Sequence, residues 1–344
     1  MICEVLNMLL KRYTGNLVLL ILLFLMLAFF FLGDVFIPKA IDFSGYPLLH
    51  SVLVVFLGLF LESIPFLFLG AIASSFIQLF ISEEIIQRMI PKSAIMAIFA
   101  AIVAALIIPV CECAIIPVVR RLIQKGVPVH AGVVLLVTAP ILNVIVFGST
   151  YYAFQNNPSI LYGRIILCVL TAVIVGLFIY IFSRKDVVKE EKLEAVHEHH
   201  VHDFPPSKWT SFIEHTSQEF FMVGRYFIIG ALFASIFQVL MDRTILAEIG
   251  QAPIKGTALM MGIAFVLSLC SSADAFVAAS FSHSFLPGSI LGFLVFGPML
   301  DLKNVLIMMS CFKRSFVLTY VLLVFAVVFS LCLIAGGLIS KGGL

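Results

Sequence analysis

Residues 93–119 read SAIMAIFAAIVAALIIPVCECAIIPVV, an apolar run that contains Pro109, Pro117 and a charged Glu112 between two cysteines. A helix needs about 20 consecutive apolar residues to cross a hydrocarbon core, and this run is long enough. Proline breaks the hydrogen-bond ladder of a helix, and irregular backbone at membrane depth persists only where protein or a water-filled cavity satisfies its polar groups. The stretch therefore predicts a broken helix that lines a site inside a membrane protein.

The composition of the whole chain agrees with this interpretation. Hydrophobic residues make up 62% of the 344 positions and charged residues 12%, whereas ordinary soluble domains have about 25% charged residues. Mean hydropathy is +1.17. No water-soluble fold can hide so much apolar surface, so a soluble enzyme is excluded. The net charge of +2 is too small to indicate nucleic-acid binding.

Apolar blocks recur along the chain and predict an all-α, multi-pass protein of the cell membrane. The blocks are residues 17–32, 47–81, 93–119, 128–154, 160–182, 219–241, 256–279, 287–312 and 315–340. The second block contains Glu62 and Pro65 and is long enough to tilt, kink or break. Lys11 and Arg12 precede the first block without a cleavage site after it, which predicts an uncleaved anchor helix within residues 1–46.

One long hydrophilic segment, residues 183–216, divides the chain. We therefore predict an anchor over residues 1–46, a first membrane repeat over 47–182, a cytoplasmic linker over 183–216 and a second membrane repeat over 217–344. The linker carries four closely spaced histidines: His197, His199, His200 and His202. A solvated hinge is the plain interpretation of this segment, and binding of a transition metal is the alternative.

The two halves share motifs at offsets of 158 to 160 residues, which predicts a duplication. Three motifs in the first half have matches in the second: Gly70-Ala71-Ile72 with Gly230-Ala231-Leu232, Cys111-Glu112-Cys113 with Cys270-Ser271-Ser272, and Ala139-Pro140-Ile141-Leu142-Asn143 with Gly297-Pro298-Met299-Leu300-Asp301. An odd number of crossings between the halves would invert the second one. The expected fold is thus a helical membrane protein with two inverted repeats and broken or re-entrant helices.

Basic residues in short loops favour the cytoplasmic side of a membrane. Basic residues flank the run 93–119 on both sides: Arg88, Lys92, Arg120, Arg121 and Lys125. Because a full crossing would put one group outside, we predict that this run is a re-entrant hairpin, and residues 256–285 a second one. The expected total is about seven full crossings plus the hairpins, with conventional crossings as the alternative.

Cys111-Glu112-Cys113 is the strongest local signal for chemistry. On a regular helix residues i and i+2 point apart, but on a broken turn the two thiols can converge and suit a soft metal or metalloid. The alternative is a pair of small buried side chains. Carboxyl groups inside a membrane are costly and mark functional sites, which favours a functional role for Glu112.

A second polar cluster, residues 269–276, contains Cys270, Ser271, Ser272 and Asp274. Its hydroxyl and carboxyl groups can replace the hydration shell of a solute or hold a proton; the alternative is that the serines only bond the backbone of a kinked helix. The predicted substrate-binding residues are Cys111, Glu112, Cys113, Asn143, Cys270, Ser271, Ser272, Asp274 and Asp301. The predicted proton-coupling residues are Asp274, Glu112 and Glu62. The candidate soft-metal ligands are Cys111, Cys113 and Cys270.

These motifs, with residues 121–128, 138–143 and 296–300, resemble the core of a family of predicted bacterial permeases. The resemblance covers roughly residues 47–340, and the family includes organoarsenical efflux permeases. The family often has Cys-Ser-Cys-Gly where this chain has Cys111-Glu112-Cys113-Ala114. The resemblance implies a transporter, and the added carboxyl group favours a cationic ligand or a proton site.

We therefore expect a membrane permease that exports a small soft or thiol-reactive solute, such as a metal, a metalloid or a sulfur species, by ion-coupled alternating access. We expect the two broken segments to meet and to form its site. No nucleotide-binding loop is present in the sequence, and no cofactor is expected. The expected partners are the lipid bilayer and the solute, another membrane protein is a further candidate, and nucleic acid is not expected. Two alternatives remain open, namely a non-transporting membrane subunit that docks a partner and a membrane thiol enzyme.

Overall fold

The computed structural model of the chain describes residues 47–84, 86, 91, 93–107, 111–182, 187–189, 208–240 and 252–342. Regular structure in these residues is α-helical, and the β-type pairing among them is an isolated bridge between Val188 and Phe312. The all-α prediction is confirmed. The predicted anchor helix and the four linker histidines lie outside the described residues.

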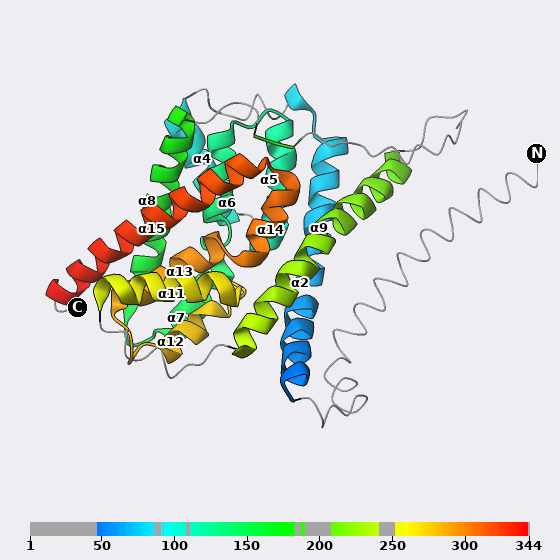
Figure 1. Cartoon of the computed structure of the whole chain (residues 1–344). Coiled ribbons are helices and arrows are strands. Elements are labelled where there is room, and N and C mark those ends of the chain that lie inside the picture. The colour runs from blue at the N-terminus through cyan, green and yellow to red at the C-terminus, as the bar shows by residue number, and fades with distance from the viewer. Residues whose placement is uncertain are drawn as a thin grey trace, which may run out of the picture. The chain divides into compact units, whose positions relative to one another are not determined.

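Long helices give the chain its membrane-spanning character (Figure 1). They are α2 (Pro47–Phe80), α8 (Pro158–Phe182), α9 (Lys208–Leu240) and α15 (Arg314–Gly342). Among the described residues, five segments are long and apolar enough to cross a membrane: Leu48–Phe80, Pro158–Phe182, Trp209–Leu240, Pro287–Cys311 and Arg314–Ile339. Helix α2 continues through Pro65. Helix α9 begins at Lys208, within the segment predicted to be linker.

Four of the predicted apolar blocks are divided into pairs of short helices. The pairs are α4 (Ala94–Ile107) with α5 (Glu112–Gln124), α6 (Val129–Thr138) with α7 (Val144–Ala153), α11 (Pro253–Leu267) with α12 (Asp274–Ser280), and α13 (Pro287–Met299) with α14 (Leu302–Cys311). The sequence predicted the interruptions in the blocks 93–119 and 256–279. It did not predict those at residues 139–143 and 300–301, because hydropathy stays high through both.

The short helices pack in matched ways in the two halves. Helix α4 packs on α6 and α8, and α11 packs in the same way on α13 and α15. Across the halves, α5 packs on α14 and α12 packs on α7. Helices α4 and α5 both pack on the short helix α6, and the re-entrant hairpin remains a prediction. The inverted repeat itself remains a prediction.

Glycines permit two close helix contacts that position the short helices. A Cβ atom on Gly70 of α2 would lie 2.8 Å from the Cα of Ala114 on α5, and one on Gly230 of α9 would lie 3.0 Å from the Cα of Lys303 on α14. These glycines occupy matching places in the two predicted repeats. A larger side chain at either position would push the long helix away from its short neighbour.

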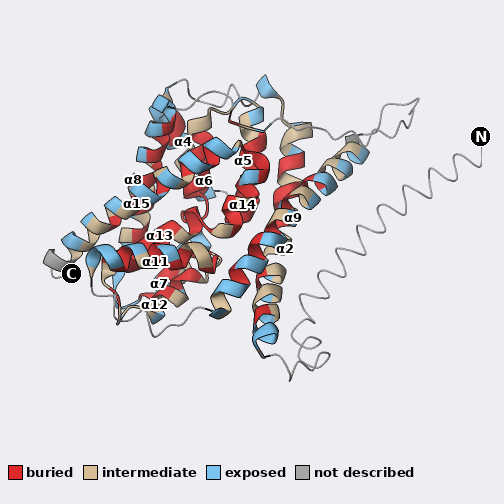
Figure 2. Ribbon diagram, viewed as in Figure 1, coloured by how far each residue is buried: buried red, intermediate tan, exposed pale blue. Residues whose placement is uncertain are grey.

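Burial separates the short helices α13 and α14 from the long ones (Figure 2). In the segment Pro287–Cys311, 89% of the most apolar window is buried, against 22% to 39% in the other four spans. Helices α8, α9 and α15 instead expose large apolar side chains, among them Ile181, Phe233 and Leu322. Such faces suit contact with lipid. The enclosed short helices are therefore the place where polar residues can be held away from the hydrocarbon.

Candidate functional site

The two polar motifs predicted from the sequence meet at the helix breaks. Cys111 is the N-cap of α5 and Glu112 is its first residue, while Asp274 is the first residue of α12. Ser271 Oγ donates a hydrogen bond to Glu112 Oε2 at 3.4 Å. Glu112 and Ser271 hold matching places in the two motifs, so the predicted apposition of the motifs is confirmed.

The other two breaks carry the same cap. Asn143 Oδ1 accepts a hydrogen bond from the backbone amide of Val146 at 2.8 Å, and Asp301 Oδ1 accepts one from the amide of Asn304 at 2.6 Å. Asn and Asp are preferred N-caps because a side-chain oxygen satisfies an amide that the helix leaves unpaired. These two predicted substrate residues therefore restart α7 and α14 after the interruptions.

Helices α5 and α14 bring further polar groups together. Cys113 Sγ lies 3.7 Å from Asn304 Oδ1 in hydrogen-bonding geometry. Lys303 Nζ lies 3.8 Å from Asp301 Oδ2, and both residues are 1% exposed. The carboxyl group of Glu112 interacts electrostatically with Lys303 and Asp301. The ammonium group of Lys303 thus balances the charge of two buried carboxyl groups, those of Asp301 and Glu112, in this part of the site.

On the opposite side, Arg164 of α8 holds α12 and α7. Its guanidinium donates to Asp274 Oδ2 at 2.7 Å, to Thr150 Oγ1 at 2.7 Å and to the carbonyl oxygen of Ser271 at 3.2 Å. Arg164 is not among the residues predicted from the sequence. It could have been found as the single arginine of the apolar block 160–182, because a cation inside the membrane requires a partner. Asp274 keeps Oδ1 without a hydrogen-bond partner among the described residues.

Part of the site is open. Cys111, Cys270 and Ser272 are half-buried, whereas Glu62 on α2 is exposed. Cys270 Sγ and Ser272 Oγ lie 3.4 Å apart. The thiols of Cys111 and Cys270 are near enough to interact electrostatically, and Glu62 interacts with Glu112 and Cys270. Each half thus contributes one half-buried thiol to this part of the site.

The three predicted soft ligands do not converge in this conformation. Within the described ranges, no group of three or more His, Cys, Asp or Glu residues is placed to hold a metal ion. Cys113 is directed to Asn304 on α14, while Cys111 and Cys270 flank the contact between the two motifs. A shared three-thiol site would need a change of conformation and remains a prediction.

Arg120 and Arg121 have a role that differs from the predicted one. Their sequence context predicts loop charges that set orientation, but they lie on α5 and are 1% and 6% exposed. Arg121 Nη2 lies 2.7 Å from Glu219 Oε2 on α9, and Arg120 Nη1 lies 3.8 Å from Glu219 Oε1. The two arginines join α5 to α9 through Glu219. The predicted topology therefore depends on the remaining loop charges.

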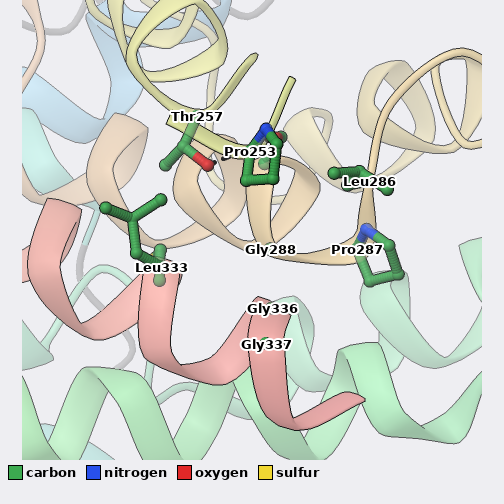
Figure 3. A pocket seen from close by; sticks show the side chains of 10 residues that line it. Pro253, Thr257, Leu286, Pro287, Gly288, Leu333, Gly336 and Gly337 are labelled. Atoms are coloured by element: carbon green, nitrogen blue, oxygen red, sulfur yellow. Dashed lines mark hydrogen bonds between the residues drawn. The ribbon is translucent and has the colours of Figure 1, made fainter. Parts of the chain in front are cut away.

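A small cavity of about 120 Å³ lies away from these residues (Figure 3). It is lined by the starts of α11 and α13 and by the glycine-containing end of α15, with Thr257, Gly288 and Gly336 among its residues. Thr257 Oγ1 and Ser289 Oγ are hydrogen-bonded to each other at 3.2 Å. Since Thr257 is near the start of α11 and Cys270 follows its end, the cavity and the polar site are separate.

Comparison with known proteins gives consistent matches. A family model described as "Predicted permease" matches residues 48–337. "UPF0718 protein YcgR" of Bacillus subtilis (strain 168) is 44% identical over 300 residues, which cover 87% of this chain and 99% of that protein. "Putative two-component membrane permease complex subunit" of Streptococcus mutans serotype c (strain ATCC 700610 / UA159) is 35% identical over 288 residues, covering 83% and 94%. No solved structure matches the chain with significant similarity.

Proposed function

The chain belongs to this predicted permease family, and we propose that it exports a small cationic or neutral thiophilic solute through the site at its helix breaks. The observation that carries the proposal is the contact between Ser271 and Glu112 at 3.4 Å, beside the half-buried thiols Cys111 and Cys270. Thiols are ligands for soft metals and metalloids. The two halves supply one such thiol each.

The balance of buried charge supports a cation over an anion. Among the described residues of the site, the three buried carboxyl groups of Glu112, Asp274 and Asp301 are accompanied by two buried cations, Arg164 and Lys303. Arg164 is hydrogen-bonded to Asp274, which leaves Lys303 for the other two carboxyl groups. The site therefore has an excess carboxyl group that a solute cation or a proton can neutralise, and a sulfur oxyanion is the poorer fit.

Glu112 is our candidate for proton coupling. Asp274 is also predicted from the sequence as a proton-coupling residue, but its carboxyl group is bound to Arg164 at 2.7 Å. The direct partner of Glu112 is the neutral hydroxyl of Ser271. A carboxyl group without a bound cation can gain and lose a proton at lower cost. One charge that moves through 100 mV supplies about 2.3 kcal/mol, which can drive accumulation without nucleotide hydrolysis.

The packing of the short helices supports alternating access. Helices α5 and α14 pair on one side of the site and α7 and α12 on the other. Inverted repeats with broken helices around a central site are a recurring architecture of secondary transporters. The Streptococcus mutans relative is named as a subunit of a two-component complex, so we further propose that a second membrane protein assists transport.

The test is transport by the full chain in proteoliposomes, with Cd²⁺, Zn²⁺, arsenite and thiosulfate supplied separately under a proton gradient. We expect gradient-dependent movement of the thiophilic solutes. Cys111→Ser with Cys270→Ser should lower their transport at least about tenfold, which corresponds to about 1.4 kcal/mol of binding free energy. Cys332→Ser, a buried thiol on α15, is the matched control and should transport normally.

Other outcomes identify the alternatives. Movement of thiosulfate alone, unaffected by the cysteine changes, would contradict a thiophilic solute and favour an anion held by hydroxyl groups. No movement of any solute, with or without the partner, would favour a subunit that only docks another membrane protein. A covalent thiol intermediate without solute movement would favour a membrane enzyme.

A further inference from the structure

Lys303 occupies a place that ordinary helix packing does not favour. It follows the N-cap Asp301 in the first turn of α14 and is 1% exposed, on one of the most enclosed segments of the chain (Figure 2). The N-terminus of a helix carries about half a positive charge, which repels a cation. A buried lysine there requires negative partners beyond the helix itself.

The contact between Lys303 and Asp301 is longer than two of the buried ion pairs of the described residues, and equals the 3.8 Å contact of Arg120 with Glu219. Arg164 with Asp274 and Arg121 with Glu219 are both hydrogen-bonded at 2.7 Å, whereas Lys303 Nζ lies 3.8 Å from Asp301 Oδ2. That distance is too long for a hydrogen bond. Asp301 Oδ2 accepts no hydrogen bond from the described residues, so this carboxyl group keeps an acceptor available.

Two carboxyl groups and a thiol lie near Lys303. Asp301 Oδ2 is 3.8 Å from its ammonium group, Glu112 is on α5, which packs on α14, and Cys113 Sγ is 3.7 Å from the neighbouring Asn304 Oδ1. On α9 its backbone meets Gly230, which brings no charge. Lys303 also makes the strongest charge interaction of Glu112. Its ammonium group is thus placed among the carboxyl and thiol groups that the proposed function assigns to the solute.

We propose that Lys303 is a tethered counter-cation of the transport site. Its ammonium group neutralises Glu112 and Asp301 when the site is empty, a solute cation displaces it, and its return helps to release the solute. Lysine suits this role because it is a compact charge on a flexible four-carbon stem, unlike the planar, hydrogen-bonding guanidinium of arginine. The inference rests on the proposed function and adds that the solute competes as a cation.

The test measures Cd²⁺ binding to the detergent-purified full chain by calorimetry, and Cd²⁺ transport in proteoliposomes. Lys303→Met removes the competing charge, so the Kd for Cd²⁺ should fall at least about tenfold while the maximal transport rate falls because release is slower. Lys303→Arg keeps the charge and should bind Cd²⁺ no more tightly than the unmodified chain. Lys189→Met, an exposed lysine that donates to the Met309 carbonyl at the far end of α14, should change neither quantity.

A purely structural role predicts the opposite pattern, in which Lys303→Met weakens binding and Lys303→Arg restores it. That pattern, or an unchanged Kd in Lys303→Met, would overturn the inference and leave the proposed function standing. If Lys303→Met and Lys303→Gln fold only with Cd²⁺ present, the ion replaces the lost charge as proposed; if neither folds in either condition, the role is structural. If the unmodified chain binds neither Cd²⁺ nor Zn²⁺, the inference is overturned and the proposed function is restricted to a neutral thiophilic solute such as arsenite.

Discussion

Glu112 and Asp274 are the first residues of matching helices in the two halves, but their neighbours differ, and we infer different roles for them. Asp274 is bound to the buried guanidinium of Arg164, which also reaches Thr150 and the Ser271 carbonyl. Glu112 has a hydroxyl partner and shares Lys303 with Asp301. At the scale of the residue, Asp274 is therefore held by an ion pair, whereas we expect Glu112 to be the carboxyl group that exchanges partners.

Substitution of these two carboxyl groups should separate stability from coupling. Asp274→Asn leaves Arg164 buried without its counter-charge, and loss of one partner of a buried ion pair costs about 3–5 kcal/mol. Glu112→Gln removes a group that no cation binds directly, so it should retain stability but lose proton-driven accumulation.

Thermal unfolding of each purified variant, with proteoliposome transport in parallel, checks this pair of expectations. Equal stability of Asp274→Asn and the unmodified chain would show that Arg164 does not depend on Asp274. Concentrative transport by Glu112→Gln would remove Glu112 from the coupling step.

At the scale of the element, the helix breaks are maintained by caps and by close packing. Asn143 and Asp301 each cap the restarted helix through the amide three residues on. Gly70 and Gly230 then let a long helix approach α5 and α14 closely. Interrupted backbone at membrane depth is stable only where such groups satisfy and cover it.

Two glycines of α2 allow a matched test of this packing. Gly70→Ala would bring a methyl group within 2.8 Å of the Ala114 backbone, whereas Gly58 has no atom within 4 Å of the added carbon. Overpacking costs about 1–3 kcal/mol, so Gly70→Ala should unfold at lower temperature. Gly58→Ala should be neutral or more stable by up to about 1 kcal/mol. Equal melting temperatures for the two variants would mean that α2 does not approach α5 closely in the membrane.

At the scale of the whole molecule, the two predicted repeats are interlocked and not side by side. Residues Val54–Leu344 form one compact unit. Buried ion pairs join the halves at two places, through Arg164 with Asp274 and through Arg121 with Glu219. Any movement between the halves must either break these ion pairs or move both partners of a pair together. We therefore expect the moving parts to separate at these ion pairs or to be held together by them.

The side of the membrane on which each connecting segment lies is a property of the whole molecule. The predicted crossings place the linker over residues 186–211 in the cytoplasm, and Asn157 and Lys341 outside. A membrane-impermeant thiol reagent on intact cells should label Asn157→Cys and Lys341→Cys, while Glu194→Cys should react only after permeabilisation. Reaction of Glu194→Cys in intact cells would contradict the inverted arrangement of the halves.

The sequence by itself determined that the chain is an all-helical membrane protein and that its polar motifs at residues 111–113 and 270–274 interrupt apolar runs. These are local properties, because hydropathy over some twenty residues decides whether a segment partitions into lipid. Matching motifs also predicted correctly that the two polar clusters meet. The capped interruptions at Asn143 and Asp301 were missed, since a cap changes backbone direction without lowering hydropathy.

Tertiary structure alone decided which charges pair. Arg164 finds Asp274 across 110 positions and Arg121 finds Glu219 across 98, and no pattern along the chain encodes such distances. The same packing turned Arg120 and Arg121 from expected loop charges into buried ones and placed Lys303 near Glu112. The physical reason is that the membrane selects segments by their apolar content, whereas a buried charge is stabilised only by the particular partner that folding brings to it.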